Sequence, residues 1–318
     1  MNLALQAEPS ETSSEERLST EQLLSYSAPM LGYSFVQMLF TLYLMKFATD
    51  TLLIAPAAMG TVFFIGRIWD AISDPLAGYG SDRTRTRLGR RRPWMMAAAP
   101  LLLLAPVAMW APPQSLSATE LTLWMTVAVL LYETAATVFY VPHLALGAEL
   151  TLDHHGRTRL FAWRQVTHYA GFALAIIGMY FLIQATDKRS IALQLALVGG
   201  GAVGGLCLWS ALRLRERVEH QQRAGRGLFN SAADVFRNPH ARLLLAVFFI
   251  ESLGGAALGT LGPYFMDYVV GDESLFPVLL VAHILPVPLV AMASVPLSRR
   301  LGKKRVWLLG MVFSAVSF

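Results

Sequence analysis

Long apolar runs constrain the fold of this 318-residue chain more than any other feature of its sequence. Each run is long enough to cross a bilayer as a helix, which takes about 20 mostly apolar residues. With 55% apolar and only 15% charged residues, the composition excludes a set of soluble domains. The sequence therefore predicts an all-α membrane protein with spans near residues 23–48, 53–79, 94–112, 119–148, 159–185, 190–212, 241–270 and 275–297.

An eight-residue motif occurs twice, as Arg-Leu-Gly-Arg-Arg-Arg-Pro-Trp at 87–94 and as Arg-Leu-Gly-Lys-Lys-Arg-Val-Trp at 300–307. Each copy lies between two apolar runs, which indicates a duplicated bundle of two parallel six-helix halves. A further run starts at Val306, and the 13 residues from there to Phe318 rise only about 20 Å as a helix. We therefore expect the second half to be truncated in the ninth helix.

The predicted organisation has four parts. Residues 1–22 are acidic and polar, without the apolar stretch of a secretory signal, and are expected to form a disordered N-terminal tail. Residues 23–212 form an N-terminal six-helix bundle, and residues 213–240 form a charged linker between the halves. Residues 241–318 form a partial C-terminal bundle that contains helices 7 and 8 and part of helix 9.

Arg and Lys are concentrated in every second connection, at 83–92, 157–159, 213–242 and 299–305. By the positive-inside bias these connections and the N-terminus face the cytoplasm, so we expect a multi-pass protein of the cytoplasmic (inner) membrane. The net charge of +5 is then a topology signal, and no nucleic-acid partner is predicted.

Several small motifs indicate packing and not chemistry. The single cysteine, Cys207, lies in an apolar run, so no intrachain disulfide can form. The glycine clusters at 199–205 and 254–255 lack the Lys-Ser/Thr of a phosphate loop and are predicted to allow close helix packing. Adjacent histidines at 154–155 lack a second ligand pair. No metal, no cofactor and no enzyme activity are predicted.

Arg67, Asp70 and Asp74 are the sharpest polar constellation, because their spacing places all three on one face of the second predicted helix. Buried charges in a bilayer are costly unless they face a cavity or one another, and one arginine cannot neutralise two acids. With the hydroxyl of Ser73 beside them, the acids suit a bound monovalent cation or a shared proton. A structural ion-pair ladder is the alternative, and the coupling-ion site is favoured.

Other polar residues inside apolar runs are candidates for substrate binding. Glu133 lies in the middle of the fourth predicted helix and either faces the cavity or bonds to a neighbouring helix. Arg164 in the fifth helix is expected to hold an anionic group or Glu133, while His168 is either a ligand or a packing histidine. Trp69 and Tyr140 can stack on a sugar ring, although packing roles are commoner for aromatic side chains.

The loop at 78–94 combines glycines, one acid and six arginines at a membrane face. It either sets topology through its positive charge alone or closes neighbouring helix ends through ion pairs. Pro142 is expected to loosen the fourth helix near the same face. The gating network predicted there consists of Asp82, Arg83, Arg90, Arg91, Glu149, Asp153, Arg157 and Arg159.

These residues resemble the major facilitator superfamily, in which a Gly-x-x-x-Asp-Arg loop followed by Gly-Arg-Arg joins the second and third helices. The loop here is longer, and Arg-x-x-Asp-x-x-x-Asp-Pro precedes it. Both features resemble the glycoside-pentoside-hexuronide:cation symporter family, and the similarity covers residues 23–318. The positions that match the loop pattern are Gly78, Asp82, Arg83, Gly89, Arg90 and Arg91.

The resemblance implies roles for four positions. Asp70 and Asp74 align with the carboxylates that bind sodium, lithium or a proton in that family, and Thr137 aligns with a hydroxyl that assists them. Arg164 aligns with an arginine near the sugar. The resemblance also implies that the run from Glu149 to 159 forms ion pairs with the loop at 78–94.

Two departures from the family pattern concern the substrate. The family's acids on the first and fourth helices fall at Ser34 and Tyr140 here, which makes galactoside recognition by that pattern doubtful. Both positions remain candidates for substrate binding.

The resulting functional expectation is a monomeric secondary transporter that imports a small solute, a sugar or glycoside, by alternating access with sodium or a proton. Its expected partners are the solute, the coupling cation and the lipid bilayer. One alternative is a transporter of a lysolipid or another amphiphile. The other is a truncated membrane protein that does not transport.

Overall fold

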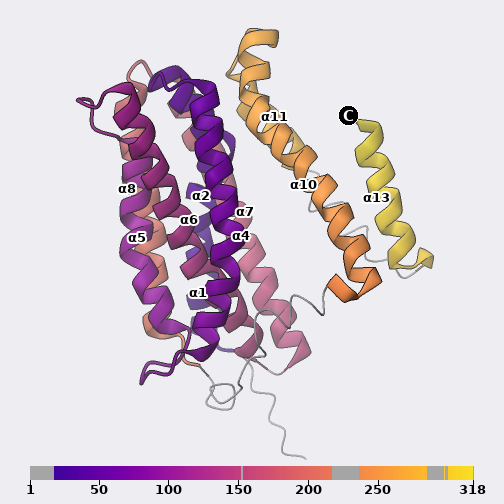
Figure 1. Ribbon diagram of the computed structural model, residues 1–318. Helices are drawn as coiled ribbons and strands as arrows, with labels where there is room; N and C mark the ends of the chain where they lie inside the picture. Colours follow the sequence, from indigo (N-terminus) through magenta and orange to yellow (C-terminus); the bar gives the residue numbers. More distant parts are fainter. Residues whose placement is uncertain (1–17, 152, 217–235, 285–296, 298–299, 318) are drawn as a thin grey trace, which may run out of the picture.

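The computed structural model describes residues 18–151, 153–216, 236–284, 297 and 300–317 (Figure 1). Within these ranges the chain is helical and the predicted all-α fold is confirmed. Most of the predicted N-terminal tail and of the predicted linker lies outside the described residues. The helices are α1 (Thr20–Ser27), α2 (Pro29–Leu42), α3 (Leu44–Lys46), η1 (Phe47–Thr51), α4 (Pro56–Arg83), α5 (Arg92–Trp110), α6 (Ala118–Glu149), α7 (His154–Gln184), α8 (Lys188–Arg213), α10 (Pro239–Phe265), η3 (Met266–Val270), α11 (Leu275–Ile284) and α13 (Lys303–Ser317).

Five helical segments of the described chain are long and apolar enough to cross a membrane: α5, α6, α7, α8, and α10 with η3. The segment from Thr20 to Thr51 bends by 53° near Tyr43 and makes a sixth if it is counted as one span. Helix α4 is not among them, since Arg67, Asp70 and Asp74 interrupt its apolar sequence. The chain is therefore a multi-pass membrane protein whose α4 carries unusual charge.

Helix α1 begins at Thr20, three residues before the predicted start at residue 23. The cause is a capping box: the Ser19 side chain accepts from the Gln22 amide, and the Gln22 side chain accepts from the Ser19 amide. These bonds satisfy amide groups that the first helical turn leaves without partners. Residues 20–22, which the sequence analysis assigned to the disordered tail, therefore belong to α1.

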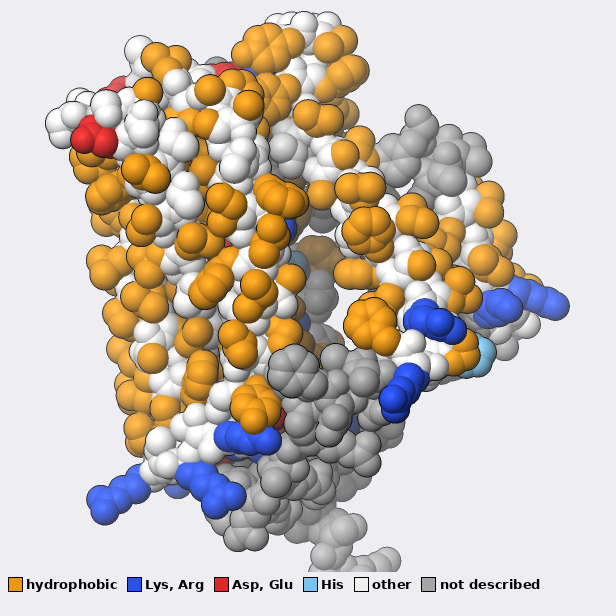
Figure 2. All heavy atoms as spheres, in the orientation of Figure 1, with side chains coloured by type: hydrophobic (Ala, Val, Ile, Leu, Met, Phe, Trp, Pro, Cys, Tyr) orange, Lys and Arg blue, Asp and Glu red, His pale blue; other side chains and the backbone are white. Residues whose placement is uncertain are grey.

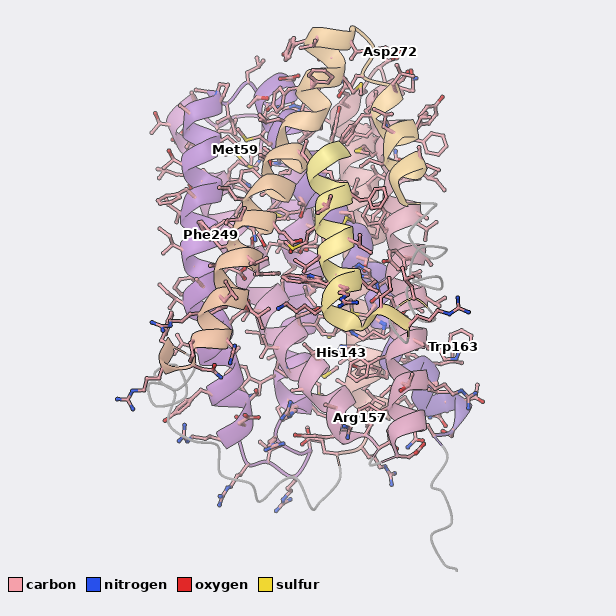
Figure 3. All side chains as sticks on the ribbon, turned by 90° about the vertical axis from the view of Figure 1, so that its right-hand side faces the viewer. Met59, His143, Arg157, Trp163, Phe249 and Asp272 are labelled. Carbon is pink, nitrogen blue, oxygen red and sulfur yellow. The ribbon has the colours of Figure 1, made fainter. Side chains whose placement is uncertain are left out.

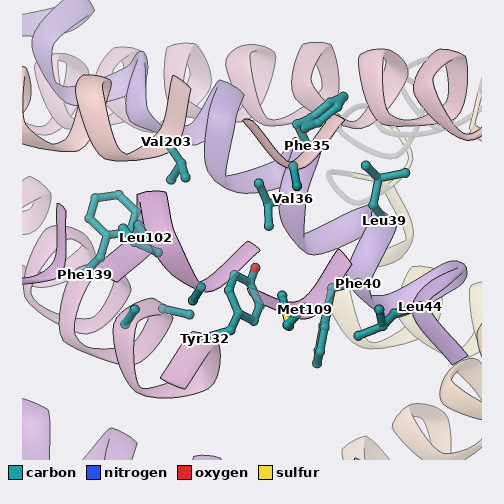
Figure 4. Packing of buried hydrophobic residues seen from close by; sticks show 14 of the residues in the cluster. Phe35, Val36, Leu39, Phe40, Leu44, Leu102, Met109, Tyr132, Phe139 and Val203 are labelled. Atoms are coloured by element: carbon teal, nitrogen blue, oxygen red, sulfur yellow. The ribbon is translucent and has the colours of Figure 1, made fainter. Parts of the chain in front are cut away.

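Helices α1 to α8 form a closely packed bundle, which we call the N-terminal bundle. Helix α2 packs on α7 and α8, α5 packs on α6 and α8, and α4 packs on α6. Figure 4 shows Phe35, Phe40, Leu102, Tyr132 and Phe139 among the side chains that fill the space between α2, α5 and α6. Helix α6 packs on α5 on one side and on α4 on another, so it connects α4 to this core.

Glycines bring some of these helices together. A Cβ atom on Gly200 or Gly204 of α8 would lie 2.6 or 2.7 Å from a backbone oxygen of α5. These contacts confirm the predicted close packing at Gly200 and Gly204, whereas a Cβ on Gly201 or Gly205 would meet no described atom within 4 Å. The same prediction is wrong for Gly254 and Gly255 within the described chain, because a Cβ on either would meet no atom within 4 Å.

Helices α10, α11 and α13 lie to one side of the N-terminal bundle, and α13 stands apart from it (Figure 1). Helix α10 contacts α2 and α3, and α11 contacts α7. Figure 2 shows a hollow between the bundle and α10, with Lys and Arg side chains gathered at the lower ends of the bundle, α10 and α13. We call this the arginine-rich end. Figure 3 shows Arg157 near this end and Asp272 at the opposite end.

Candidate functional site

The carboxylates of Asp70 and Asp74 converge on one hydroxyl group. Thr137 of α6 lies 2.7 Å from an Asp74 oxygen and 3.4 Å from an Asp70 oxygen, measured from its Oγ1 atom. Ser73 donates to the same Thr137 oxygen over 3.3 Å. Since Ser73 and Thr137 are buried, the α4–α6 contact fixes the position of both hydroxyls. The structure therefore brings together the four residues predicted to bind the cation.

Charge around this cluster is unbalanced. Arg67 approaches Asp70 to 3.7 Å, whereas no basic side chain forms an ion pair with Asp74 in the described part of the chain. Two like charges near one hydroxyl repel, and a monovalent cation or a shared proton relieves that repulsion. Across the described ranges, no group of three or more His, Cys, Asp or Glu side chains is arranged to hold a metal ion.

Arg67 also forms an ion pair that the sequence did not indicate. Its Nη2 atom lies 3.2 Å from Glu133 Oε1, although Glu133 sits on α6 and its side chain is only 5% exposed. From the sequence, Arg164 was the expected partner of Glu133, and the structure pairs Glu133 with Arg67 instead. Arg67 thus bridges Glu133 and Asp70 and connects the cation candidates to the middle of α6.

The remaining substrate candidates lie around α2, α6 and α7. Tyr140 stacks on Tyr33 of α2 with ring centroids 5.3 Å apart, and the Arg164 guanidinium lies 5.2 Å from the Tyr140 ring centroid. Ser34 Oγ and His168 Nδ1 are 2.5 Å apart, so the two residues bond to each other. Four of the six predicted substrate residues therefore take part in these contacts.

Trp69 lies at the α4–α6 contact and not with the other substrate candidates. Its indole Nε1 donates to the Thr134 hydroxyl of α6 over 2.8 Å, while 38% of the residue stays exposed. The bond fixes the ring at the α4–α6 contact. An exposed, oriented indole is able to stack on a sugar, but in the described part of the chain it makes no contact with Arg164 or His168.

The loop at 84–91 forms ion pairs at the arginine-rich end. Glu149 Oε1 lies 2.7 Å from Arg90 and 2.8 Å from Arg91, and Arg91 also contacts Asp82 at 3.0 Å. Burial lowers the pKa of Arg91, and the two nearby carboxylates act in the opposite direction. These pairs join the ends of α4, α5 and α6, as the loop-closing prediction requires.

Four members of the predicted gating network do not take part in these ion pairs in the described part of the chain. Arg83 stacks on the Tyr79 ring with 3.5 Å to its centroid. Arg157 donates to the Thr151 carbonyl over 3.2 Å, and neither it nor Arg159 forms an ion pair within the described residues. The expected ion pairs at Arg157 and Arg159 are therefore not seen among the described residues. Asp153 accepts from the Gly156 amide at the start of α7.

Glu216 is an anchoring residue that sequence reasoning missed. Its carboxylate accepts from the backbone amides of Arg90, Arg91 and Arg92 over 2.7 to 3.0 Å, at the N-terminus of α5. A carboxylate is favourable there because the first amides of a helix point toward it. Glu216 lies three residues after α8 ends at Arg213, and the sequence analysis placed it only within a charged linker.

A second missed cluster, which we call the Lys46 cluster, lies at the opposite end. Lys46 is 2% exposed and lies 2.5 Å from both Asp50 and Asp267. Glu273 accepts from the Tyr43 hydroxyl over 2.7 Å and lies 3.9 Å from Lys46. The sequence feature that could have indicated this cluster is Lys46 itself, a single lysine near the end of the apolar run at 23–48. The cluster joins the N-terminal bundle to η3 and α11.

Comparison with known proteins agrees with the resemblance seen in the sequence. A family profile described as MFS/sugar transport protein matches residues 25–318. Inner membrane symporter YicJ of Escherichia coli (strain K12) is 31% identical over 257 residues, which cover 76% of this chain and 53% of the relative. Isoprimeverose transporter of Lactiplantibacillus pentosus is 27% identical over 316 residues, which cover 92% of this chain and 62% of the relative.

An animal relative is also similar. Sodium-dependent lysophosphatidylcholine symporter 1 of Mus musculus is 30% identical over 165 residues, which cover 51% of this chain and 31% of the relative. The chain spans about half the length of the curated relatives that it matches. With charged α4 packed on α6 and the family profile extending through residue 318, the chain belongs to the MFS/sugar transport protein family and to its glycoside-pentoside-hexuronide:cation symporter branch.

Proposed function

We propose that this protein is a cation-coupled secondary transporter that imports a small solute by alternating access, and not an enzyme. Sodium or a proton is the coupling ion, held by Asp70 and Asp74 with the hydroxyls of Ser73 and Thr137. The solute binds near the contacts that Tyr140, Arg164, Ser34 and His168 make between α2, α6 and α7. Family membership and the symporter names of the relatives support this proposal.

One observation carries the cation site: two carboxylates meet at one Thr137 hydroxyl, and only one of them has a basic neighbour. A permanent ion-pair ladder would give each acid its own partner. An unpaired acid in a membrane helix is costly unless a cation or proton neutralises it in a wet cavity. Reversible binding of that cation is what coupling requires.

Solute uptake into proteoliposomes tests the cation site. Uptake driven by an inward sodium or proton gradient is expected to be lost in Asp70→Asn and in Asp74→Asn. The exposed residue Arg213, which pairs with Glu21 at the arginine-rich end, provides a control as Arg213→Gln. Gradient dependence that is unchanged in both aspartate variants would falsify the cation site.

The overall architecture follows from the repeated motif. We propose two parallel six-helix halves, with residues 23–212 as the first, 213–240 as the linker and 241–318 as part of the second. Gly89 before α5 and Gly302 before α13 both adopt positive φ, at 108° and 82°, which supports equivalent positions in the two halves. The arginine-rich end faces the cytoplasm, the protein lies in the inner membrane, and it acts as a monomer.

The proposed solute is a sugar or glycoside. The stacked rings of Tyr33 and Tyr140 form an aromatic surface of the kind that binds a sugar face, and Ser34 and His168 supply polar groups beside it. The name of the isoprimeverose transporter agrees with this class.

A lysolipid is the second candidate. An apolar groove of about 340 Å³ between α2, α7 and α8 is lined by residues such as Leu31, Leu174 and Val198, and it is large enough for part of an acyl chain. A lysophosphatidylcholine symporter is among the relatives. Competition of uptake by glycosides, but not by lysolipids, is expected for the sugar transporter, and the reverse result supports the lipid transporter.

A further inference from the structure

The start of α5 and the end of α8 bind each other through two charged side chains. The Glu216 carboxylate accepts from three consecutive backbone amides, at residues 90–92, over 2.7 to 3.0 Å. In the opposite direction, the Arg92 guanidinium donates to the carbonyls of Ala211 and Leu212 in the last turn of α8, over 2.6 and 3.1 Å. We call these two sets of contacts the reciprocal cap.

Each charge of the reciprocal cap lies where the helix dipole favours it. The first amides and the last carbonyls of a helix have no partners within the helix and carry partial positive and negative charge. An acid at the start of α5 and a base at the end of α8 therefore stabilise both helix ends. Farther along, the same two helices pack closely at Gly200 and Gly204. The reciprocal cap thus fixes the residues directly after α8 to the start of α5.

The amides that bind Glu216 belong to residues whose side chains close the arginine-rich end. Arg90 and Arg91 both donate to Glu149 Oε1 of α6, over 2.7 and 2.8 Å, and Arg91 also donates to Asp82 of α4 over 3.0 Å. Both arginines are buried. Their side chains are held by Glu149 and their backbone is held by Glu216. The position of Glu216 therefore determines where both guanidinium groups lie.

The turn before α5 has a shape that admits the Glu216 carboxylate. Gly89 has φ 108°, and a Cβ atom there would lie 2.6 Å from that carboxylate. The Thr86 hydroxyl donates to the Gly89 carbonyl over 2.6 Å and closes the turn. A larger residue at this position would displace the carboxylate from the amides. The loop and Glu216 therefore fit each other sterically as well as electrostatically.

We infer that Glu216 is a positioning residue for the gate at the arginine-rich end: it holds the loop so that Arg90 and Arg91 reach Glu149, and its release loosens these ion pairs. Glu216 lies at the start of the predicted linker between the two halves. A displacement of that linker is thereby transmitted to α6, which Glu216 does not need to touch. This inference rests on the proposed function, in which the arginine-rich end opens and closes during each transport cycle.

The test measures how readily water-soluble reagents reach Ser81. This residue is 1% exposed and directly precedes Asp82 in α4, so loosening of the ion pairs is expected to uncover it. The chain has one native cysteine, Cys207, which is buried and gives little background. The Ser81→Cys variant of the purified full chain in detergent is labelled with a charged maleimide.

Glu216→Ala is expected to increase the labelling rate at least about tenfold, because charge-assisted hydrogen bonds are lost. Glu216→Asp keeps a carboxylate and is expected to restore the rate to within about threefold of the parent. The melting temperature of each variant is measured in parallel.

Two further variants separate positioning from a simple loss of stability. Ser117→Ala removes the N-cap of α6 at the opposite end of that helix, where the Ser117 hydroxyl accepts from the Glu120 amide. It is expected to lower the melting temperature and to leave labelling unchanged. Glu149→Gln is expected to speed labelling by itself, and adding Glu216→Ala should then increase the rate by less than about threefold.

Three results would overturn the inference. They are unchanged labelling in Glu216→Ala, an equal increase in Ser117→Ala, and effects of Glu216→Ala and Glu149→Gln that multiply in full. Each of them would reduce Glu216 to a helix cap that acts on stability alone.

Labelling requires neither solute nor a cation gradient, so this inference and the proposed function can fail separately. Faster labelling in Glu216→Ala, in a chain that shows no gradient-driven uptake, counts against transport and leaves the positioning role standing. Gradient-driven uptake together with unchanged labelling in Glu216→Ala retains transport and removes the positioning role.

Discussion

Lys46 Nζ lies 2.5 Å from Asp267 Oδ2, and this ion pair connects residues that are 221 positions apart in the sequence. The rings of Tyr264 and Tyr268 lie 5.3 and 5.0 Å from the same ammonium group, and Thr49 bonds to Tyr264 over 2.7 Å. The bundle and the α10–η3 segment are therefore held together at the end opposite the arginine-rich loops. Opening that end requires these contacts to separate.

Replacing Lys46 with Gln is expected to lower the stability of the protein by roughly 1–3 kcal/mol, because it leaves Asp50 and Asp267 together without their cation. Asp267→Asn is expected to cost less, since Asp267 is 37% exposed. Thermal unfolding of both variants and of the double variant gives the coupling energy. Lys188→Gln is the control, because Lys188 lies 3.8 Å from Glu273 and is 30% exposed. Strictly additive effects would show that Lys46 and Asp267 do not interact.

Thr137→Val is expected to weaken apparent sodium or proton affinity by roughly tenfold, because the hydroxyl that both carboxylates share is lost while the side-chain volume is kept. Thr137→Ser retains the hydroxyl and is expected to stay within about threefold of the wild type. The measurement is the cation concentration or pH that gives half-maximal solute uptake. Similar affinity in the Val and Ser variants contradicts a role for the hydroxyl.

Gly89→Ala is expected to destabilise the protein more than Gly302→Ala. Both glycines have positive φ, which costs an L-residue roughly 1 kcal/mol. A Cβ on Gly89 would in addition lie 2.6 Å from the Glu216 carboxylate, whereas one on Gly302 meets no atom within 4 Å. Thermal unfolding of the two variants compares the effects directly. Glu216→Gln should reproduce part of the Gly89→Ala effect, and equal losses for both glycine variants would exclude the Glu216 contact as the cause.

Arg67→Gln is expected to destabilise the bundle, because it leaves Glu133 buried without its only ion-pair partner in the described chain. Adding Glu133→Gln to Arg67→Gln should recover part of the lost stability, since the pair is then removed as a whole. The recovery is measured by thermal unfolding of the single and double variants in the absence of sodium. A double variant less stable than Arg67→Gln would show that Glu133 has another role in folding.

The sequence alone predicted much of the secondary structure, because apolar run length is a local property. The runs near 94–112, 119–148 and 190–212 correspond closely to α5 (Arg92–Trp110), α6 (Ala118–Glu149) and α8 (Lys188–Arg213). The spacing of Asp70 and Asp74 likewise placed both acids on one helix face, since 3.6 residues make one turn. The bend near Tyr43 was not predicted, as no proline or glycine marks it.

Contacts between distant helices were decided only by tertiary structure. Nothing in the sequence indicated that Glu133 would pair with Arg67 and not with Arg164. Nor did it indicate that the Glu216 carboxylate would bind the first amides of α5. The sequence determines directly where helices form and how long each span is, because both depend on residues that are neighbours along the chain. Pairing of charges depends on how helices rotate and pack against one another, so it becomes fixed only when α4, α6 and α7 are assembled.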